Sequence, residues 1–378
     1  MDKILDSLKT LAQKPLSEAK ALPRDVYISA DILHHELEHI FGHDWICAGR
    51  NDEIPNVGDY LTFDLGDQPL LLVRGTDNNI HARANVCLHR MMRLADGSGH
   101  TKKFTCPYHA WTYDIDGRLV AAAYMDRSSC FDRRHMHLPE IRCEIFHGWI
   151  YVSMNKDAVP ISNLLADLDP LVAPYQMDKY VTIFRQHNVW QTNWKHLTEN
   201  FMEGYHLPVA HKNTVGAYFG LMDTCFDDRG SFDHFTYQTF TKSSNAPVGS
   251  AHPDNKTLTG TARNTSIMPT VFPTHMYVLA PDHLWYLSLQ PLGVDQVKIL
   301  YGAAIAPEVL AAQKNVDDYI AKTRAFLDDV QEEDRFVVEN IFKGAQAPLS
   351  TSGPLSWLER ENHEFAQYLA RRLCKGDE

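Results

Sequence analysis

Two short pairs of cysteine and histidine constrain this 378-residue chain more than any other feature of its sequence. The first pair is Cys87 and His89, and the second is Cys106 and His109, with sixteen residues between the pairs. A zinc site of the Cys2His2 type groups its ligands differently, as two cysteines followed by two histidines. Here each pair supplies one thiolate and one imidazole, so the pattern indicates a site with two kinds of ligand at two metal ions.

That arrangement suits two irons, one held by Cys87 and Cys106 and the other by His89 and His109, which is the ligand pattern of a Rieske [2Fe–2S] cluster. Neutral imidazoles reduce the negative charge around the cluster. The pattern therefore predicts a reduction potential of roughly −150 to +300 mV, compared with about −400 mV for a plant-type ferredoxin. A structural zinc knuckle, or four unrelated residues, is the alternative interpretation.

The remaining sequence predicts an all-β unit followed by a mixed one. Between residues 45 and 155, short apolar and β-branched runs are broken by turn signals at residues 77–79 and 116–117. Ahead of this unit, Ser29 is a candidate cap for a helix. Beyond Pro160 we expect a helix over 193–206, a three-stranded meander over 275–305, and helices over 308–343 and 355–373. Core contacts expected in the last helix are Trp357, Leu358, Phe365, Leu369 and Leu373.

Charge and cysteine usage limit the partners and the compartment. There are 36 Lys and Arg residues against 48 Asp and Glu, and the net charge of −12 opposes binding to nucleic acid or to an anionic membrane. The N-terminus lacks the apolar run of a signal peptide, and no apolar stretch reaches the roughly 18 residues of a membrane helix. With 7 cysteines, an odd number, we expect a cytoplasmic protein without a membrane or nucleic-acid partner.

A second candidate metal site lies in the segment 193–211. When this segment is drawn as a helix, one face is apolar and the opposite face carries His196, Glu199, Glu203 and His206. Pro208 disturbs the helix, and a helix end can bring His211 back beside His206. Two imidazoles and one carboxylate form the facial triad of non-haem Fe(II) oxygenases, which leaves positions open for O2 and substrate. An amphipathic helix with a solvated charged face is the alternative.

The third ligand is expected in the acidic run 328–334 of a later helix. The helical period alone does not choose between Glu333 and Asp334. An iron site that activates O2 needs electrons delivered one at a time, and a Rieske cluster in the same chain can supply them. The two candidate sites therefore support each other. Other histidines, among them His34, His35 and His39, are expected on a solvated helix face.

Taken together, the four Cys and His ligands and the strings NWKHLTENFMEGYHLPVAH and EEDRFVVEN resemble the oxygenase component (α subunit) of Rieske non-haem iron oxygenases. The resemblance covers nearly the whole chain. It implies an α+β fold in which an all-β Rieske domain, residues 44–155, is inserted into a helix-grip catalytic domain. That catalytic domain would comprise an N-terminal helical segment, residues 1–43, and residues 156–378.

The resemblance also implies roles for individual residues. His206, His211 and Asp334 would bind one mononuclear Fe(II) per chain. Glu203 would connect an iron-ligand histidine to the Rieske histidine of a neighbouring subunit, in a head-to-tail homotrimer. Asn200, in the same matching string, is expected as a second catalytic residue.

The implied cofactors are one Rieske cluster and one Fe(II) per chain, with O2 as co-substrate. Electrons would come from NAD(P)H through a separate reductase with flavin and an iron–sulfur centre, because this chain lacks a GxGxxG motif.

The implied substrate is a small quaternary amine. The chain resembles the oxygenases of carnitine, glycine betaine, choline and proline betaine in three respects. It has a glutamate at the bridging position, a similar length and no small partner subunit. These enzymes hydroxylate next to nitrogen or remove an N-methyl group by oxidation. A cationic substrate favours an aromatic box through cation–π attraction. The candidate aromatic residues are Phe201, Tyr218, Phe219, Tyr277, Trp285 and Tyr286.

Four other functions remain as alternatives. Aromatic-ring hydroxylation and O-demethylation are the first two. A Rieske electron carrier or a zinc-stabilised binding module is the alternative from another class. A carrier would need the Rieske unit alone, whereas this chain continues for about 220 residues beyond it.

Overall fold

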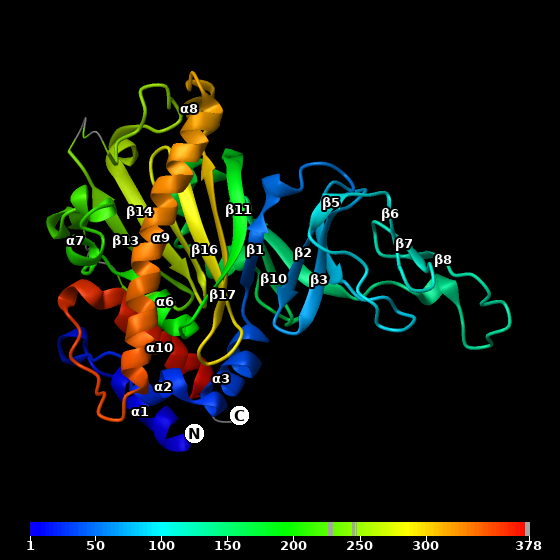
Figure 1. Cartoon of the computed structure of the whole chain (residues 1–378), viewed down its shortest axis with the longest axis horizontal. Coiled ribbons are helices and arrows are strands. Elements are labelled where there is room, and N and C mark those ends of the chain that lie inside the picture. Colours follow the sequence, from blue (N-terminus) through cyan, green and yellow to red (C-terminus); the bar gives the residue numbers. More distant parts are fainter. Residues whose placement is uncertain (226–229, 244–245, 247, 375–378) are drawn as a thin grey trace. The chain divides into compact units, whose positions relative to one another are not determined.

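The computed structural model describes residues 1–225, 230–243, 246 and 248–374, which form two compact units (Figure 1). One unit is His43–Ile161. The other combines Met1–Gly42 with the chain from Ser162 onward, so the smaller unit is an insertion in the larger one. Both units contain antiparallel sheets, and only the larger one also has long helices. The predicted fold class, an all-β domain inserted in an α+β domain, is confirmed.

The smaller unit is built from two antiparallel sheets. The larger sheet has the order β1-β10-β9-β4-β3-β2-β5, and the smaller sheet has the order β6-β7-β8. The strands are β1 Ile46–Arg50, β2 Asp59–Leu65, β3 Gln68–Arg74, β4 Ile80–Ala84, β5 Ser98–His100, β6 Lys103–Thr105, β7 Thr112–Asp114, β8 Leu119–Ala121, β9 Glu140–Phe146 and β10 Trp149–Ser153. The expected turn at residues 77–79 joins β3 to β4, and Asn78 adopts the left-handed conformation there with φ of 64°.

The larger unit contains one seven-stranded antiparallel sheet of order β11-β17-β16-β15-β14-β13-β12. Its strands are β11 Val181–Trp190, β12 Thr224–Cys225, β13 Phe235–Thr241, β14 Thr265–Val271, β15 His275–Leu279, β16 His283–Pro291 and β17 Val297–Ile305. The meander predicted over 275–305 is confirmed as β15, β16 and β17. Nearly every residue of β16 is buried, because helices cover the sheet.

The helices of the structure gather mainly in the larger unit. They are α1 Asp2–Ala12, α2 Arg24–Ile28, α3 Ala30–Glu36, α4 Ile161–Leu164, α5 Asp169–Val172, α6 Trp194–Met202, α7 Leu207–Ala210, α8 Pro307–Ala311, α9 Val316–Gln346 and α10 Arg360–Leu373. A π-helical turn, η2 Leu37–Phe41, extends α3, and Ser29 caps α3 as predicted, since its hydroxyl accepts the N–H of Ile32.

The helix α6 lies between α9 and the sheet, and it contacts both of them (Figure 1). Eight of its nine residues are buried, including Lys195 and His196. The alternative of an amphipathic helix with a solvated charged face is therefore wrong. Tertiary packing encloses both faces of this helix, and the periodicity of the sequence could not show that.

Two local expectations are wrong. The helix predicted over 193–206 ends at Met202, because Glu203 adopts an extended conformation with φ of −121° and ψ of 156°. Its carboxylate accepts the backbone N–H groups of Tyr205 and His206, which supports a turn in place of a further helical turn. Trp357 was expected in the core, but it is 67% exposed in the short turn that precedes α10. Among the described residues, no helix is long and apolar enough to cross a membrane.

Candidate metal centres

The four predicted Rieske ligands lie in two loops with the same backbone turn. In the first loop, the N–H of Met91 donates to the carbonyl oxygen of Cys87 over 3.0 Å. In the second, the N–H of Ala110 donates to the carbonyl oxygen of Cys106 over 3.0 Å. Met91 and Ala110 are both left-handed, with φ of 60° and 57°. Each loop therefore turns at the fourth residue after its cysteine.

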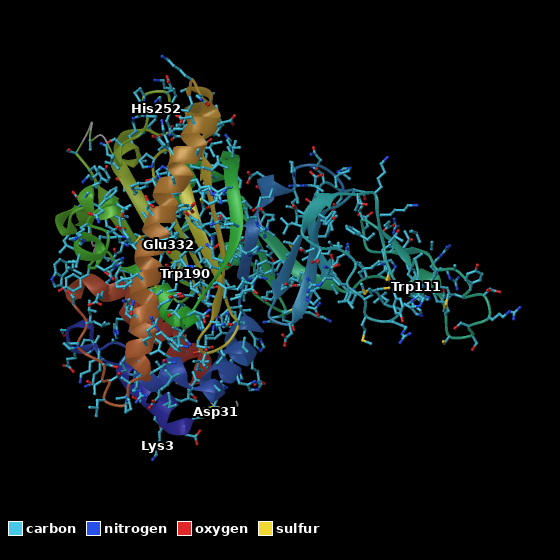
Figure 2. The ribbon with its side chains drawn as sticks, viewed as in Figure 1. Lys3, Asp31, Trp111, Trp190, His252 and Glu332 are labelled. Atoms are coloured by element: carbon cyan, nitrogen blue, oxygen red, sulfur yellow. The ribbon has the colours of Figure 1, made fainter. Side chains whose placement is uncertain are left out.

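Thiols and imidazoles occupy different environments in this unit. Cys87 and Cys106 are 1% and 3% exposed and are not joined by a disulfide. His89 and His109 are exposed, and their ring centroids are 4.7 Å apart. Two buried thiols and two outward imidazoles fit a Rieske cluster, whose histidine side would be the one that faces an electron donor or acceptor. Trp111, labelled in Figure 2, stacks on His89 with 4.7 Å between the ring centroids.

Tyr113 is a neighbour of this site that the sequence analysis missed. Its hydroxyl lies 3.4 Å from Sγ of Cys87 and accepts the backbone N–H of Leu88 over 3.0 Å. The hydroxyl proton is therefore free to point at the sulfur. Burial raises the pKa of the Cys87 thiol, and the Tyr113 hydroxyl opposes that change by stabilising the thiolate. Hydrogen bonds to cluster sulfurs raise the reduction potential of such centres.

In the larger unit, the structure brings together His206, His211 and Asp334, whose possible ligand atoms all lie within 4.8 Å of one another. Nε2 of His211 is 2.9 Å from Oδ1 of Asp334, and Nε2 of His206 is 3.7 Å from the same oxygen. The imidazole rings are 5.1 Å apart. Two nitrogens and one carboxylate oxygen lie close enough together to bind one metal ion, and this donor set fits one Fe(II) of the facial-triad type.

The short helix α7 sets the spacing of the two histidines. His206 immediately precedes it, His211 immediately follows it, and Pro208 stands in its first turn, where proline is tolerated. The following loop packs tightly against α7. A Cβ atom at Gly216 would lie 2.1 Å from the carbonyl oxygen of Leu207, so this close approach requires glycine.

Glu333 and Asp334 both contact His211, but at opposite ring nitrogens. Asp334 faces Nε2, whereas Oε2 of Glu333 accepts from Nδ1 over 2.8 Å. Oε2 of Glu333 also accepts the hydroxyl of Thr214 over 2.5 Å. Glu333 therefore holds the tautomer that leaves Nε2 of His211 free for a metal. The sequence left these two acids as alternatives, and it did not indicate Thr214.

Glu203 orients the imidazole of His206 in the same way that Glu333 orients that of His211. Oε1 of Glu203 lies 2.5 Å from Nδ1 of His206, so the imidazole donates to a carboxylate there as well. Burial alone would lower the pKa of His206, but the charge and hydrogen bond of Glu203, together with the charge of Asp334, raise it above its ordinary value. The carboxylates create a negative field that favours a bound cation. The contact between Glu203 and His206 arises from a turn, and not from one helical face as the sequence suggested.

Asn200 contacts one of the three candidate iron ligands, the carboxylate of Asp334. Its Nδ2 donates to Oδ1 of Asp334 over 2.7 Å, and its side chain is buried at the inner end of α6. This hydrogen bond orients the carboxylate. The structure therefore places Asn200, predicted as a catalytic residue, against a candidate metal ligand, where it acts as a positioning residue.

A buried polar network anchors α6 to the N-terminal helices. Nζ of Lys195 is 2.7 Å from Oε1 of Glu36, and Nε1 of Trp194 donates to Oε2 of Glu36 over 2.7 Å. One turn further, Tyr27 donates to Glu199 over 2.7 Å. Burial raises the pKa of Glu199 to about 7, although the Tyr27 hydrogen bond and the charge of Lys195 oppose this. The sequence analysis missed this network, since Glu36 lies far from α6 in the chain.

Two cavities lie near His206, the first bordering it and the second reaching the next residue of the chain. The first, of about 490 Å³, is bordered by Asn200, Glu203 and His206 and by the polar side chains of Glu199 and Tyr27. The second, of about 310 Å³, reaches Leu207, the residue after His206. Six aromatic side chains line this second cavity: Tyr218, Phe219, Phe240, Trp285, Tyr319 and Phe326.

The charge inside the aromatic cavity suits a cation. Among the described lining residues, Asp282 is the one acidic side chain, and there is no Lys or Arg. Burial lowers the pKa of the lining imidazole of His283 and so favours its neutral form, although the charge of Asp282 opposes this. Of the aromatic residues suggested by the sequence, Tyr218, Phe219 and Trp285 line the cavity. Tyr277 and Tyr286 are instead buried in the sheet, and Phe201 packs against Trp285 at 5.2 Å.

Family models match both units. The model described as "Ring hydroxylating alpha subunit (catalytic domain)" matches residues 175–375, and the Rieske [2Fe-2S] domain model matches residues 44–132. These matches locate a catalytic domain and an iron–sulfur domain in the same chain.

Characterised relatives are oxygenase subunits. The chain is 38% identical to the glycine betaine monooxygenase oxygenase subunit of Chromohalobacter salexigens, over 54% of this chain and 46% of that one. It is 32% identical to the carnitine monooxygenase oxygenase subunit of Escherichia coli K12, over 51% and 53%. The aligned region thus spans about half the length of these relatives. Choline monooxygenase of Spinacia oleracea aligns over 96% of this chain and 80% of its own, at 28% identity.

Solved structures share the fold. The quaternary ammonium Rieske monooxygenase CntA with L-carnitine superposes with a TM-score of 0.78 and 22% identity, covering 96% of this chain and 97% of its own. Naphthalene 1,2-dioxygenase of Rhodococcus sp. superposes with a TM-score of 0.82 and 19% identity, covering all of both chains. At these identities the likeness supports the architecture alone.

Proposed function

We propose that this chain, which belongs to the family of ring-hydroxylating α subunits, is the terminal oxygenase of a Rieske system and oxidises a small quaternary amine. The observation that carries the proposal is the convergence of His206, His211 and Asp334 in a chain that also holds a Rieske ligand set. Such a pairing combines a store of single electrons with a site for O2.

The proposed ligands follow from the donor atoms. His206, His211 and Asp334 would hold Fe(II), while the cysteines and histidines of the loops at 87–89 and 106–109 would hold the cluster. When bound, the iron activates O2 with electrons that arrive through the cluster. Glu203, by its hydrogen bond to Nδ1, holds the imidazole of His206 with Nε2 toward the other two proposed iron ligands. We assign residues 44–155 to the Rieske domain and residues 1–43 and 156–378 to the catalytic domain.

The proposed reaction consumes one O2, two electrons and two protons for each substrate molecule. One oxygen atom enters a C–H bond next to nitrogen, and the other leaves as water. If the carbon is an N-methyl group, the carbon–nitrogen bond then breaks to release formaldehyde and a tertiary amine, with one proton left over. If it is a chain carbon, the hydroxylated product remains.

The aromatic cavity supports a quaternary amine as the substrate. A cation over an aromatic face gains about 0.5–2 kcal/mol, and rings from several elements line this space. The carboxylate of Asp282 adds attraction for a positive charge. The relatives named glycine betaine, carnitine and choline monooxygenase agree with this chemistry. Aromatic-ring hydroxylation or O-demethylation is less well supported, because a neutral ring gains nothing from that carboxylate.

We further propose a separate reductase, a homotrimer and a cytoplasmic location. The outward imidazoles of His89 and His109 suit electron exchange at a surface. The cavity beside Glu203 offers a place for the partner subunit's His109 to approach. The solved structure of a quaternary ammonium Rieske monooxygenase gives insight into inter-subunit electron transfer in that protein. A carrier that ends with the Rieske unit, or a zinc-stabilised binding module, would not need the catalytic domain matched over residues 175–375.

The test combines metal analysis with turnover. We expect about three irons and two sulfides per chain, and a Rieske-type EPR signal that survives in His206→Ala protein while one iron and all turnover are lost. O2 uptake and formaldehyde release, measured with a surrogate reductase, should be stimulated by carnitine, choline or a betaine. Matched isosteres with a tert-butyl group in place of trimethylammonium should not stimulate them. Zinc without sulfide, or equal turnover of the neutral isosteres, would overturn the proposal.

A further inference from the structure

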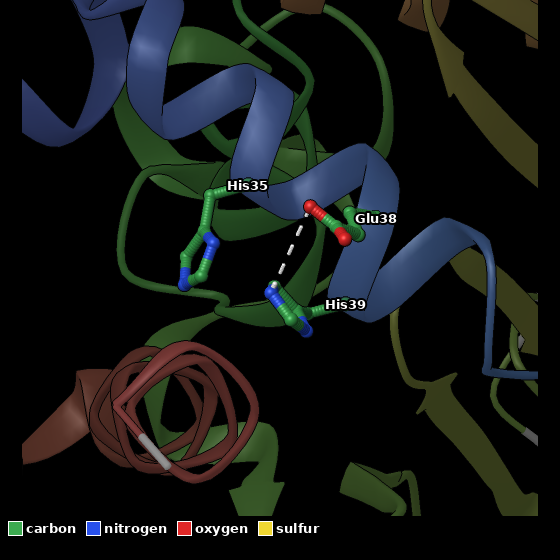
Figure 3. Close-up of side chains that lie close together, drawn as sticks. All are labelled: His35, Glu38 and His39. Carbon is green, nitrogen blue, oxygen red and sulfur yellow. Dashed lines mark ion pairs between the residues drawn. The ribbon is translucent and has the colours of Figure 1, made fainter. Parts of the chain in front are cut away.

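A second group of metal-binding side chains lies in the N-terminal helical segment, apart from the iron site. His35 belongs to α3, and Glu38 and His39 belong to the π-helical turn η2. Their possible ligand atoms all lie within 4.8 Å of one another. Figure 3 shows the three side chains around a common space, with Oε2 of Glu38 4.0 Å from Nε2 of His39. The two imidazole centroids are 4.1 Å apart.

A hydrogen bond to the backbone determines which nitrogen of His35 is free. Nε2 of His35 lies 3.0 Å from the carbonyl oxygen of Leu373, at the end of α10. A carbonyl oxygen can only accept, so Nε2 carries the proton and Nδ1 keeps its lone pair. Many metal-binding histidines are oriented in this way, with one nitrogen bound to a carbonyl and the other to the metal. The ring of His35 is therefore held ready to coordinate a metal.

The residues 35–39 spell His-Glu-Leu-Glu-His, which matches the HExxH pattern of zinc-binding helices. In zinc peptidases the glutamate next to the first histidine acts as general base. Here that residue is Glu36, which is fully buried and bonded to Lys195 and Trp194. It cannot reach a water molecule at the histidines. The second glutamate, Glu38, faces them instead, so the pattern supports metal binding without hydrolysis.

We propose that His35, Glu38 and His39 form a binding site for Zn²⁺. Two imidazoles and one carboxylate, with water in the fourth position, are a common zinc ligand set, and imidazole disfavours Mg²⁺ and Ca²⁺. A bound zinc ion would clamp η2 onto α3, and through His35 it would reinforce the contact with Leu373 of α10. The site is independent of the proposed oxygenase activity.

The test uses the iron-loaded holoprotein and equilibrium dialysis against Zn²⁺, with metals counted by mass spectrometry. Wild-type protein should bind one more zinc per chain than His39→Ala protein, and Glu38→Gln should bind it more weakly. The matched control is His34→Ala, which removes an exposed imidazole from the same helix but outside the group. Zinc that enters the iron site instead would be equal in all four proteins.

Thermal unfolding provides a second measurement. Zinc should raise the Tm of wild-type and His34→Ala protein but not of His39→Ala. Without zinc, His39→Ala should unfold at the wild-type temperature. Among the described residues, the contacts of the His39 ring that bear on this are an edge contact with His35 and a 4.0 Å ion pair with Glu38, and neither is needed for folding. Equal zinc binding in wild type and His39→Ala, or no binding by wild type, would overturn the proposal.

Discussion

The buried ion pair between Lys195 and Glu36 predicts a large and specific loss of stability when one partner is removed. The side chains are 1% and 0% exposed, and their charged atoms are 2.7 Å apart. In Lys195→Met protein the carboxylate of Glu36 keeps, within the described part of the chain, only the hydrogen bond from Trp194. Leaving one charge of a buried pair uncompensated costs about 3–5 kcal/mol. For a unit of this size, that corresponds to a fall in Tm of roughly 10 °C.

The double variant Lys195→Met/Glu36→Gln separates the charge effect from the packing effect. Glutamine keeps an acceptor for Trp194, and neither remaining side chain is charged. Replacing a whole buried ion pair by neutral groups is often close to neutral for stability. We therefore expect the double variant to recover most of the loss, with a coupling free energy of about 2–4 kcal/mol.

Two spectroscopic probes make this measurement specific to the larger unit. Urea unfolding followed by the visible absorption of the Rieske cluster reports on His43–Ile161, whereas far-ultraviolet circular dichroism reports mainly on the helices of the larger unit. Lys195→Met should shift the second transition and leave the first in place. A loss below about 1 kcal/mol in Lys195→Met, or a double variant no more stable than the single one, would refute the reasoning.

Three further outcomes are expected. The pKa of Glu199 is about 7 in the folded protein, compared with an ordinary glutamate pKa of 4.5. The stability that depends on the protonated carboxyl is therefore fully present below pH 4.5 and is lost as the pH rises to about 7. Denaturation curves should thus show the free energy of unfolding of Glu199→Gln rising relative to that of wild type, by at most about 3 kcal/mol, between these two pH values. Above pH 7 the difference between the two proteins should stay constant. Asn200→Ala, which frees the carboxylate of Asp334, should weaken iron binding about 10- to 100-fold in chelator competition; unchanged affinity would contradict the positioning role. Glu203→Gln should keep both metal centres but slow re-oxidation of the reduced cluster by orders of magnitude in stopped flow, and wild-type speed would eliminate the bridging role.

The short-range features of this protein could be predicted from its sequence. The Cys-His pairs span three or four residues, and His206 and His211 span six, so local backbone geometry brings each pair together whatever the rest of the chain does. Turn residues such as Asn78 and the cap Ser29 act through their own conformation or through hydrogen bonds to near neighbours. The meander of β15 to β17 followed from apolar runs of the right length between turn signals.

Only the tertiary structure decided what meets across long separations. Asp334 lies 123 residues after His211, and its place in the cluster depends on how α9 rotates against α6, which periodicity does not encode. The same packing turns Lys195 and Glu36 into a buried pair. It also decides that Trp285 lines a cavity while Tyr286, the next residue of the same strand, points into the core. A local pattern can indicate which residues share a face, but the partner of that face follows from the global arrangement of the sheet and helices.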